Sequence, residues 1–201
     1  IASGWVAQGP RVARFEAEFA EAVQAAHAVA VTSCTTALHL ALIVAGVGMG
    51  DEVVVPSFSF VATANAVRYV GARPAFADVD PASGNLTAET VSAALTPVTR
   101  AVIAVDQGGV PVDLDAIRAV ADPLGIVVIE DAACGAGSTY RGRPVGAGAD
   151  IAAWSFHPSK LLTTGEGGML TTAREDWALR ARRLREHAMS VSAADRHRSV
   201  L

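Results

Sequence analysis

One lysine, Lys160, lies between two apolar segments and is the first candidate for chemistry. Residues 151–154 before it and residues 167–172 after it have the composition of short buried strands. A lysine at a strand end in an open α/β sheet faces the crevice where ligands bind. Partial burial there lowers the pKa of an ammonium group, and a neutral amine can attack a carbonyl carbon to form a Schiff base. Because most lysines are solvated loop residues, other residues must support this interpretation.

A second candidate is the hydroxyl-rich turn 32–36, which follows the predicted strand 28–31 and precedes the predicted helix 37–45. The start of a helix offers unpaired backbone N–H groups and the positive end of its dipole. Together with the hydroxyls of Ser33, Thr35 and Thr36, these groups could hold a phosphate. Ordinary capping of a helix by serine or threonine is the alternative and needs no ligand.

Asp131 is the third candidate, because it stands at the end of the apolar strand predicted for residues 125–130. A carboxylate at that position lies where α/β sheets bind ligands. A helix cap or an ion pair with an arginine would explain it equally well. Glu130, one residue earlier, should point to the opposite face of the sheet.

Strands and helices alternate along the chain, and this pattern predicts an α/β fold, a three-layer sandwich with a mostly parallel sheet. Residues 1–10 are expected to be an irregular arm, and residues 141–148 a loop. Further strands are predicted at residues 51–56, 74–79, 100–105, 151–154 and 167–172, and helices at residues 12–23, 61–70, 87–95, 113–121 and 174–189.

Composition limits the class of protein. The 201 residues are 51% hydrophobic, which is enough for one sizeable buried core. A net charge of −4 with interspersed signs gives no footprint for nucleic acid, and no apolar stretch reaches the roughly 18 residues of a membrane span. Two cysteines make neither a disulfide framework nor a zinc site. With no secretion signal at the start, a cytoplasmic protein without a bound metal is expected.

The three candidates have one common explanation. Pyridoxal phosphate (PLP) needs an amine for its aldehyde, an anion beside its pyridine nitrogen and a cradle for its phosphate. Phe60 or Phe58 could cover the face of its ring, although an aromatic residue is by default part of the core. We therefore expect PLP to be the cofactor.

The chain closely resembles the PLP-dependent sugar aminotransferases of the DegT/DnrJ/StrS type, which have the fold type I large domain. Residues 155–168 carry the most specific part of the resemblance, and it extends over almost the whole sequence through residues 4–5, 8–10, 32–40, 51–80, 109–117 and 130–137. The resemblance implies transfer of an amino group, commonly from L-glutamate, to a keto group of a nucleotide-linked sugar. Polysaccharide or secondary-metabolite amino sugars would be the products.

The resemblance also implies a role for each site residue. Lys160 is the catalytic residue, which binds the cofactor's aldehyde and moves the proton, and His157 beside it has a packing or supporting role. The other cofactor-binding positions are the pyridine partner Asp131, the phosphate ligands Thr35 and Ser155, the backbone at Cys34, the ring-stacking Phe60, and Cys134. Cys34 and Cys134 depart from the family, which often has glycine at the first position and glutamine or histidine at the second.

Family members are about twice as long as this chain. Residues 1–201 are therefore expected to be a partial large PLP-binding domain of a homodimeric enzyme, without the small C-terminal domain and without its original beginning, since the first residue is Ile1. An aminocyclitol aminotransferase and a sugar dehydratase-like enzyme are alternatives, although related dehydratases carry histidine at the Lys160 position. A non-catalytic, regulatory PLP-binding module is the third alternative.

Overall fold

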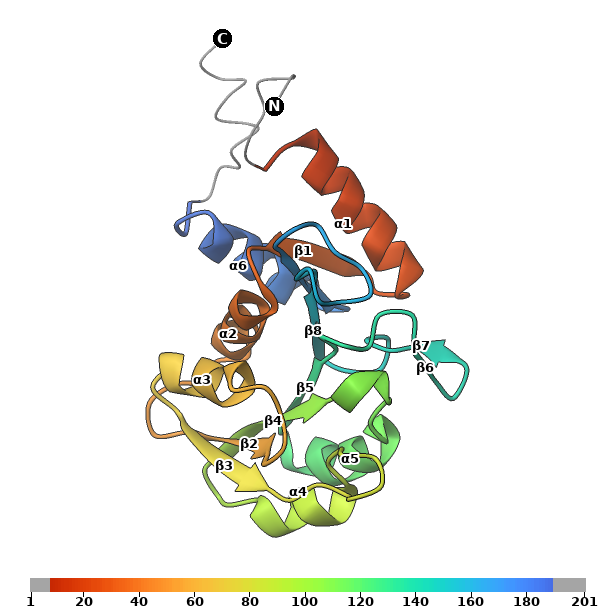
Figure 1. Ribbon diagram of the computed structural model, residues 1–201. Coiled ribbons are helices and arrows are strands. Elements are labelled where there is room, and N and C mark those ends of the chain that lie inside the picture. Colours follow the sequence, from red (N-terminus) through yellow and green to blue (C-terminus); the bar gives the residue numbers. More distant parts are fainter. Residues whose placement is uncertain (1–7, 190–201) are drawn as a thin grey trace.

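The computed structural model describes residues 8–189, and its centre is a seven-stranded sheet (Figure 1). The strand order is β1-β9-β8-β5-β4-β2-β3. β9 pairs antiparallel with both of its neighbours, and every other pair in the sheet is parallel. The strands are β1 (His27–Val31), β2 (Glu52–Pro56), β3 (Arg73–Ala77), β4 (Thr99–Val105), β5 (Val127–Asp131), β8 (Ile151–Ser155) and β9 (Gly168–Thr172).

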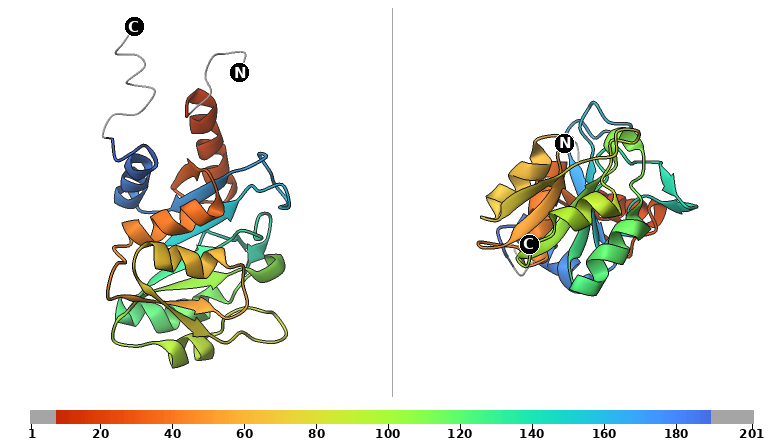
Figure 2. Two further views of the ribbon diagram at one scale, coloured as in Figure 1. Left: turned by 60° about the vertical axis from the view of Figure 1, so that its left-hand side comes forward. Right: turned by 90° about the horizontal axis from the view of Figure 1, so that it is seen from below.

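Helices cover both faces of the sheet, which confirms the predicted three-layer α/β sandwich (Figures 1 and 2). One face packs against α2 (Cys34–Val44), α3 (Ala62–Tyr69) and α6 (Glu175–Arg185). The other packs against α1 (Pro10–Ala22), α4 (Ala88–Ala94) and α5 (Leu114–Ala121). Within β2, Val53 and Val55 belong to the first core and Val54 to the second. Because side chains alternate along a strand, an apolar run of this kind buries both faces.

Several boundaries differ from the prediction. Instead of a continuous loop at residues 141–148, there is a short hairpin, β6 (Thr139–Tyr140) with β7 (Arg143–Pro144), whose turn has positive φ at Arg141 and Gly142. α3 begins at Ala62, within one residue of the predicted start, and the Ser57 N–H before it donates to the Ala77 carbonyl (2.8 Å) and keeps the chain beside β3. The expected irregular arm lies mostly outside the described residues, and its last residue, Pro10, begins α1.

Two short 3-10 helices and one charged cluster complete the fold. The 3-10 helices are η1 (Gln107–Gly109) after β4 and η2 (Asp122–Leu124) after α5.

The charged cluster is centred on Glu16 of α1, which is buried. Glu16 accepts the Ala30 N–H of β1 (2.8 Å) and pairs with Arg185 of α6 (2.5 Å). This buried pair joins the first and last described helices to β1.

Nothing in the described part of the chain is both long enough and apolar enough to serve as a helical membrane span.

Candidate active site

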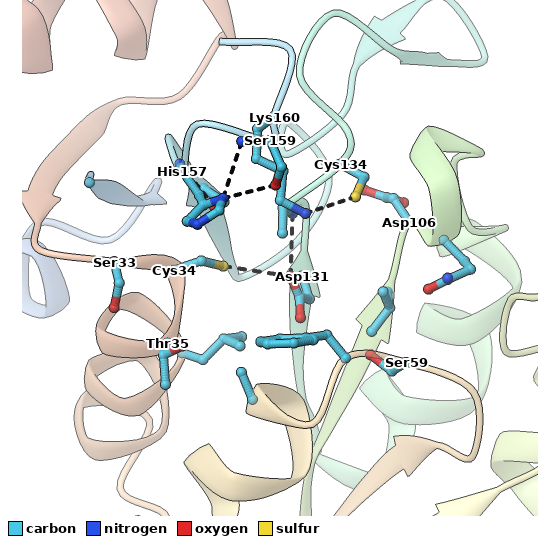
Figure 3. Close-up of a pocket in the computed structure, with 18 of the residues that line it drawn as sticks. Ser33, Cys34, Thr35, Ser59, Asp106, Asp131, Cys134, His157, Ser159 and Lys160 are labelled. Atoms are coloured by element: carbon cyan, nitrogen blue, oxygen red, sulfur yellow. Dashed lines mark hydrogen bonds between the residues drawn. The ribbon is translucent and has the colours of Figure 1, made fainter. Parts of the chain in front are cut away.

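A cavity of about 410 Å³ opens where β4, β5 and β8 end and α2 begins (Figure 3). Because the carboxyl ends of parallel strands meet at one edge, Asp106 after β4, Asp131 in β5 and Ser155 in β8 come together there. All seven residues predicted for the site line this cavity: Cys34, Thr35, Phe60, Asp131, Cys134, Ser155 and Lys160.

Lys160 follows β8 in a tight turn, in which its backbone N–H donates to the His157 carbonyl (2.9 Å). The side chain is half-buried, and Nζ lies 3.2 Å from Sγ of Cys134 (Figure 3). Lys160 is also the single lysine in all 201 residues. Any chemistry of this chain that needs a lysine amine therefore takes place in this cavity.

Asp131 lies at the floor of the cavity and is 5% exposed. Its Oδ2 accepts the Thr63 hydroxyl (3.0 Å), and its Oδ1 accepts the Ala133 N–H (3.3 Å) and the Cys34 thiol (3.6 Å). Burial raises the pKa of Asp131, whereas these donors and the Lys160 charge oppose the rise. Three donors thus hold the carboxylate in one orientation, ready to pair with a cation above it.

Glu130 confirms the predicted alternation, because it points to the other face and accepts the Gly146 N–H (2.8 Å) at Oε2. It does not line the cavity around Lys160.

The start of α2 forms another wall of the cavity. Ser33 caps the helix, since its Oγ accepts the Thr36 N–H (3.1 Å), and the N–H groups of Cys34 and Thr35 belong to the first turn, which has no intrahelical acceptors. A Cβ on Gly168 would lie 2.4 Å from the Ser33 carbonyl carbon, so only glycine lets β9 pass this close. Burial, followed by the nearby Asp131 charge, raises the pKa of the Cys34 thiol well above its ordinary value.

Phe60 lines the cavity and is 76% exposed, so the alternative that it belongs to the core is wrong. Phe58 is also exposed but does not line the cavity. An exposed aromatic ring at a cavity wall is suited to cover a flat ligand. Of the two phenylalanines considered from the sequence, the structure therefore favours Phe60.

His157 is exposed and lines the cavity, so of the two roles expected for it the supporting one agrees with its position and the packing one does not. Its Nδ1 lies 2.8 Å from Oγ of Ser159, the residue before Lys160, and its Nε2 lies 3.8 Å from a Glu166 carboxylate oxygen. The histidine thus braces the turn that carries the lysine.

Sequence reasoning missed Asp106 and Thr63. Asp106 follows β4 as Asp131 ends β5, so the strand-end argument that singled out Asp131 applied to it as well. It is fully buried, and its Oδ1 accepts the Val112 N–H (3.0 Å), whereas its Oδ2 has no hydrogen-bond partner among the described residues. Burial, followed by the Glu130 charge, raises the pKa of Asp106 to about 8. Thr63 lies in the first turn of α3, three residues after Phe60, and no sequence signal joins it to Asp131.

Within residues 8–189, no cluster of three or more histidine, cysteine or acidic side chains could hold a metal ion. Both cysteines are free thiols.

The whole chain can now be compared with known proteins. The spore coat polysaccharide biosynthesis protein SpsC of Bacillus subtilis (strain 168) is 48% identical over 199 residues, which are 99% of this chain and 51% of SpsC. The structure of DesI in the presence of its TDP-sugar product matches with a TM-score of 0.89 and 38% identity, over 96% of this chain and 49% of DesI. Spr1654 from Streptococcus pneumoniae, in its PLP form, matches with a TM-score of 0.82 and 32% identity, over 86% of this chain and 48% of Spr1654.

The chain therefore spans about half the length of these relatives. The model of the DegT/DnrJ/EryC1/StrS aminotransferase family matches residues 1–200, almost the whole sequence. The chain belongs to the DegT/DnrJ/EryC1/StrS aminotransferase family.

Proposed function

We propose that this chain is the PLP-binding large domain of a longer aminotransferase, which transfers an amino group to a keto group of a nucleotide-linked sugar. The observation that carries the proposal is the meeting of the single lysine, the buried Asp131 and the start of α2 in one cavity. These three groups are the amine, the anion and the phosphate cradle that PLP needs.

The donor set of the cavity fits the cofactor. The N–H groups at the start of α2, with the hydroxyls of Thr35 and Ser155 on the cavity wall, suit a phosphate. Asp131 at the floor suits a protonated ring nitrogen, and Lys160 suits an aldehyde. Phe60 supplies an exposed apolar face for a flat ring. No cation other than Lys160 lines the cavity within the described residues, so the helix start is the group that would favour an anion there.

Each residue then has a defined task. Bound PLP supplies an electron sink that stabilises negative charge on the carbon next to the amino nitrogen. Lys160 binds the aldehyde carbon through Nζ and afterwards moves a proton at Nζ as general acid and base. Asp131, held by Thr63 and the Ala133 N–H, keeps the ring nitrogen protonated. His157 and Ser159 keep the lysine turn in place.

The substrates follow from the family and from DesI, whose structure was solved with a TDP-sugar product. We propose a nucleotide-linked sugar as the amino acceptor and L-glutamate as the donor. We also propose that the longer enzyme acts in the cytoplasm as a homodimer, whose partner subunit would supply a further wall for the nucleotide-linked sugar.

The test is a visible absorption spectrum of the purified protein with PLP, before and after addition of L-glutamate. We expect a yellow band in the wild type that glutamate bleaches, and no band in Lys160→Ala. Asp131→Asn, which keeps the shape of the side chain but removes the anion, should bind PLP and bleach at least tenfold more slowly. If folded wild-type protein shows no lysine-dependent band, the proposal is wrong.

A further inference from the structure

The Lys160 amine donates a hydrogen bond to a thiol. Nζ of Lys160 lies 3.2 Å from Sγ of Cys134, and both side chains face the cavity (Figure 3). Cys134 is exposed to solvent and reaches the lysine from the loop after β5. Two of the strongest nucleophiles among side chains therefore stand side by side with open space in front of them.

The other thiol of the chain has a different setting. Cys34 points at Asp131, to whose Oδ1 it donates (3.6 Å), and it lies at the first turn of α2 (Figure 3). Burial and that carboxylate raise the pKa of the Cys34 thiol, so it stays protonated. Of the two cysteines, Cys134 is the one placed to react at a carbon bonded to the lysine nitrogen.

We propose that Lys160 and Cys134 form a two-nucleophile site that binds a single aldehyde carbon through nitrogen and sulfur together. The ligand class is an aldehyde small enough for the 410 Å³ cavity. That the native aldehyde is PLP rests on the proposed function, whereas the paired nucleophiles are a property of this chain's own residues.

The reaction is balanced without an oxidant. The amine nitrogen attacks the aldehyde carbon, and the carbonyl oxygen leaves as water with the two hydrogens of the amine, which gives a carbon–nitrogen double bond. The thiol sulfur then bonds to the same carbon, the electron pair of the double bond moves to nitrogen, and nitrogen takes the thiol proton. Both steps reverse when the sulfur leaves.

Addition of the thiol has a measurable consequence. The carbon that bears nitrogen and sulfur is saturated, so it no longer extends the conjugation of an aromatic ring, and visible absorption is replaced by near-ultraviolet absorption. An incoming amine can exchange only with the unsaturated form. Addition of the Cys134 thiol therefore slows exchange of the bound aldehyde with an incoming amine.

The first experiment uses o-phthalaldehyde on the cofactor-free protein, because this probe gives a fluorescent isoindole when one amine and one thiol react with the same molecule. With a single lysine and two cysteines, the assignment is direct. We expect one isoindole per chain in the wild type and in Cys34→Ser, and at least a tenfold loss in Cys134→Ser and Lys160→Arg. The arginine variant retains the N-terminal amine and so controls for its reaction.

The second experiment compares PLP spectra of the same proteins. Cys134→Ser should raise the ratio of visible to near-ultraviolet absorption severalfold over the wild type, and should bleach faster with L-glutamate. Full isoindole yield in folded Cys134→Ser, or an unchanged spectral ratio, would overturn the proposal. If PLP gives no lysine-dependent band in any variant while o-phthalaldehyde still gives the Cys134-dependent isoindole, the proposed function fails and the paired site stands.

Discussion

Replacing Asp106 by asparagine should remove a large part of the pH dependence of stability. Asp106 is fully buried, and its Oδ2 has no hydrogen-bond partner in the described part of the chain. Burial and the nearby Glu130 raise its pKa to about 8, so the folded protein keeps this carboxyl protonated at neutral pH. Asparagine has nearly the same shape, keeps an oxygen for the Val112 N–H and is neutral at every pH.

The sign and size of the effect follow from the two protonation states. In the unfolded chain an aspartate has a pKa of about 3.9, so between pH 4 and pH 8 the folded state of Asp106 holds one proton more than the unfolded state. The stability that the folded state gains from the raised pKa of Asp106 is therefore fully present below about pH 4, and it is lost as the pH rises to about 8. The slope is about 1.4 kcal/mol per pH unit, or roughly 3 kcal/mol between pH 5 and pH 7.

Urea unfolding of the cofactor-free protein at pH 5, 6 and 7, followed by tryptophan fluorescence, measures this difference. The buried Trp154 makes the signal sensitive to loss of the core. The free energy of unfolding of Asp106→Asn should rise by roughly 3 kcal/mol relative to wild type between pH 5 and pH 7. Asp113→Asn is the control, because its pKa is lowered and it is ionised in both states over this range. Parallel curves for wild type and Asp106→Asn would refute the assignment of a protonated Asp106.

Two further substitutions test the packing around the site. Gly168→Ala should push β9 from the first turn of α2, lower the free energy of unfolding by about 1–3 kcal/mol and weaken PLP binding, whereas Gly48→Ala, with open space at its Cβ, should do neither. Thermal melts and PLP titrations measure both effects, and equal behaviour of the two variants would contradict the close approach. Glu16→Ala should cost about 3–5 kcal/mol in chemical unfolding because it removes the short carboxylate contact of the largely buried Arg185, which then keeps, among the described residues, only the Ala30 carbonyl and the longer contact with Glu186. Glu18→Ala, in an exposed pair, should change stability little, and a small effect of Glu16→Ala would show that Arg185 finds water instead.

Much of the fold was predictable because buried strands and amphipathic helices leave distinct patterns. Residues 126–129 are an uninterrupted apolar run, and such runs are typical of strands buried on both faces. The hairpin β6–β7 was missed because two-residue strands are too short to show alternation, and its turn depends on positive φ at Arg141, where a non-glycine residue is uncommon.

The part of the site that depends only on the order of the strands was predictable. The ends of parallel strands meet at one edge, so Asp131 and Ser155 had to lie close together once the strand order was given. Contacts between side chains from distant elements carry no comparable signal. Cys134 and Lys160 are 26 residues apart, and their contact depends on the side-chain conformations and on the paths of two loops. The hydrogen bond from Thr63 to Asp131 spans 68 residues and is equally invisible in the sequence.

Asp131 and Asp106 both stand at strand ends on the cavity floor, but their surroundings differ in the groups that favour a negative charge. Asp131 receives three hydrogen-bond donors and faces the Lys160 charge, whereas Asp106 receives one donor and faces the Glu130 charge. Hydrogen bonds and a nearby cation favour the ionised form of a carboxyl, and burial beside another acid favours the neutral form. A cation above the floor, such as a protonated ring nitrogen, would therefore pair with Asp131, while the proton on Asp106 prevents a second buried charge. Burial raises the pKa of both carboxyls, but three donors and the Lys160 charge oppose the rise at Asp131 whereas a single donor opposes it at Asp106, so a cation bound above the floor would favour the anion at Asp131.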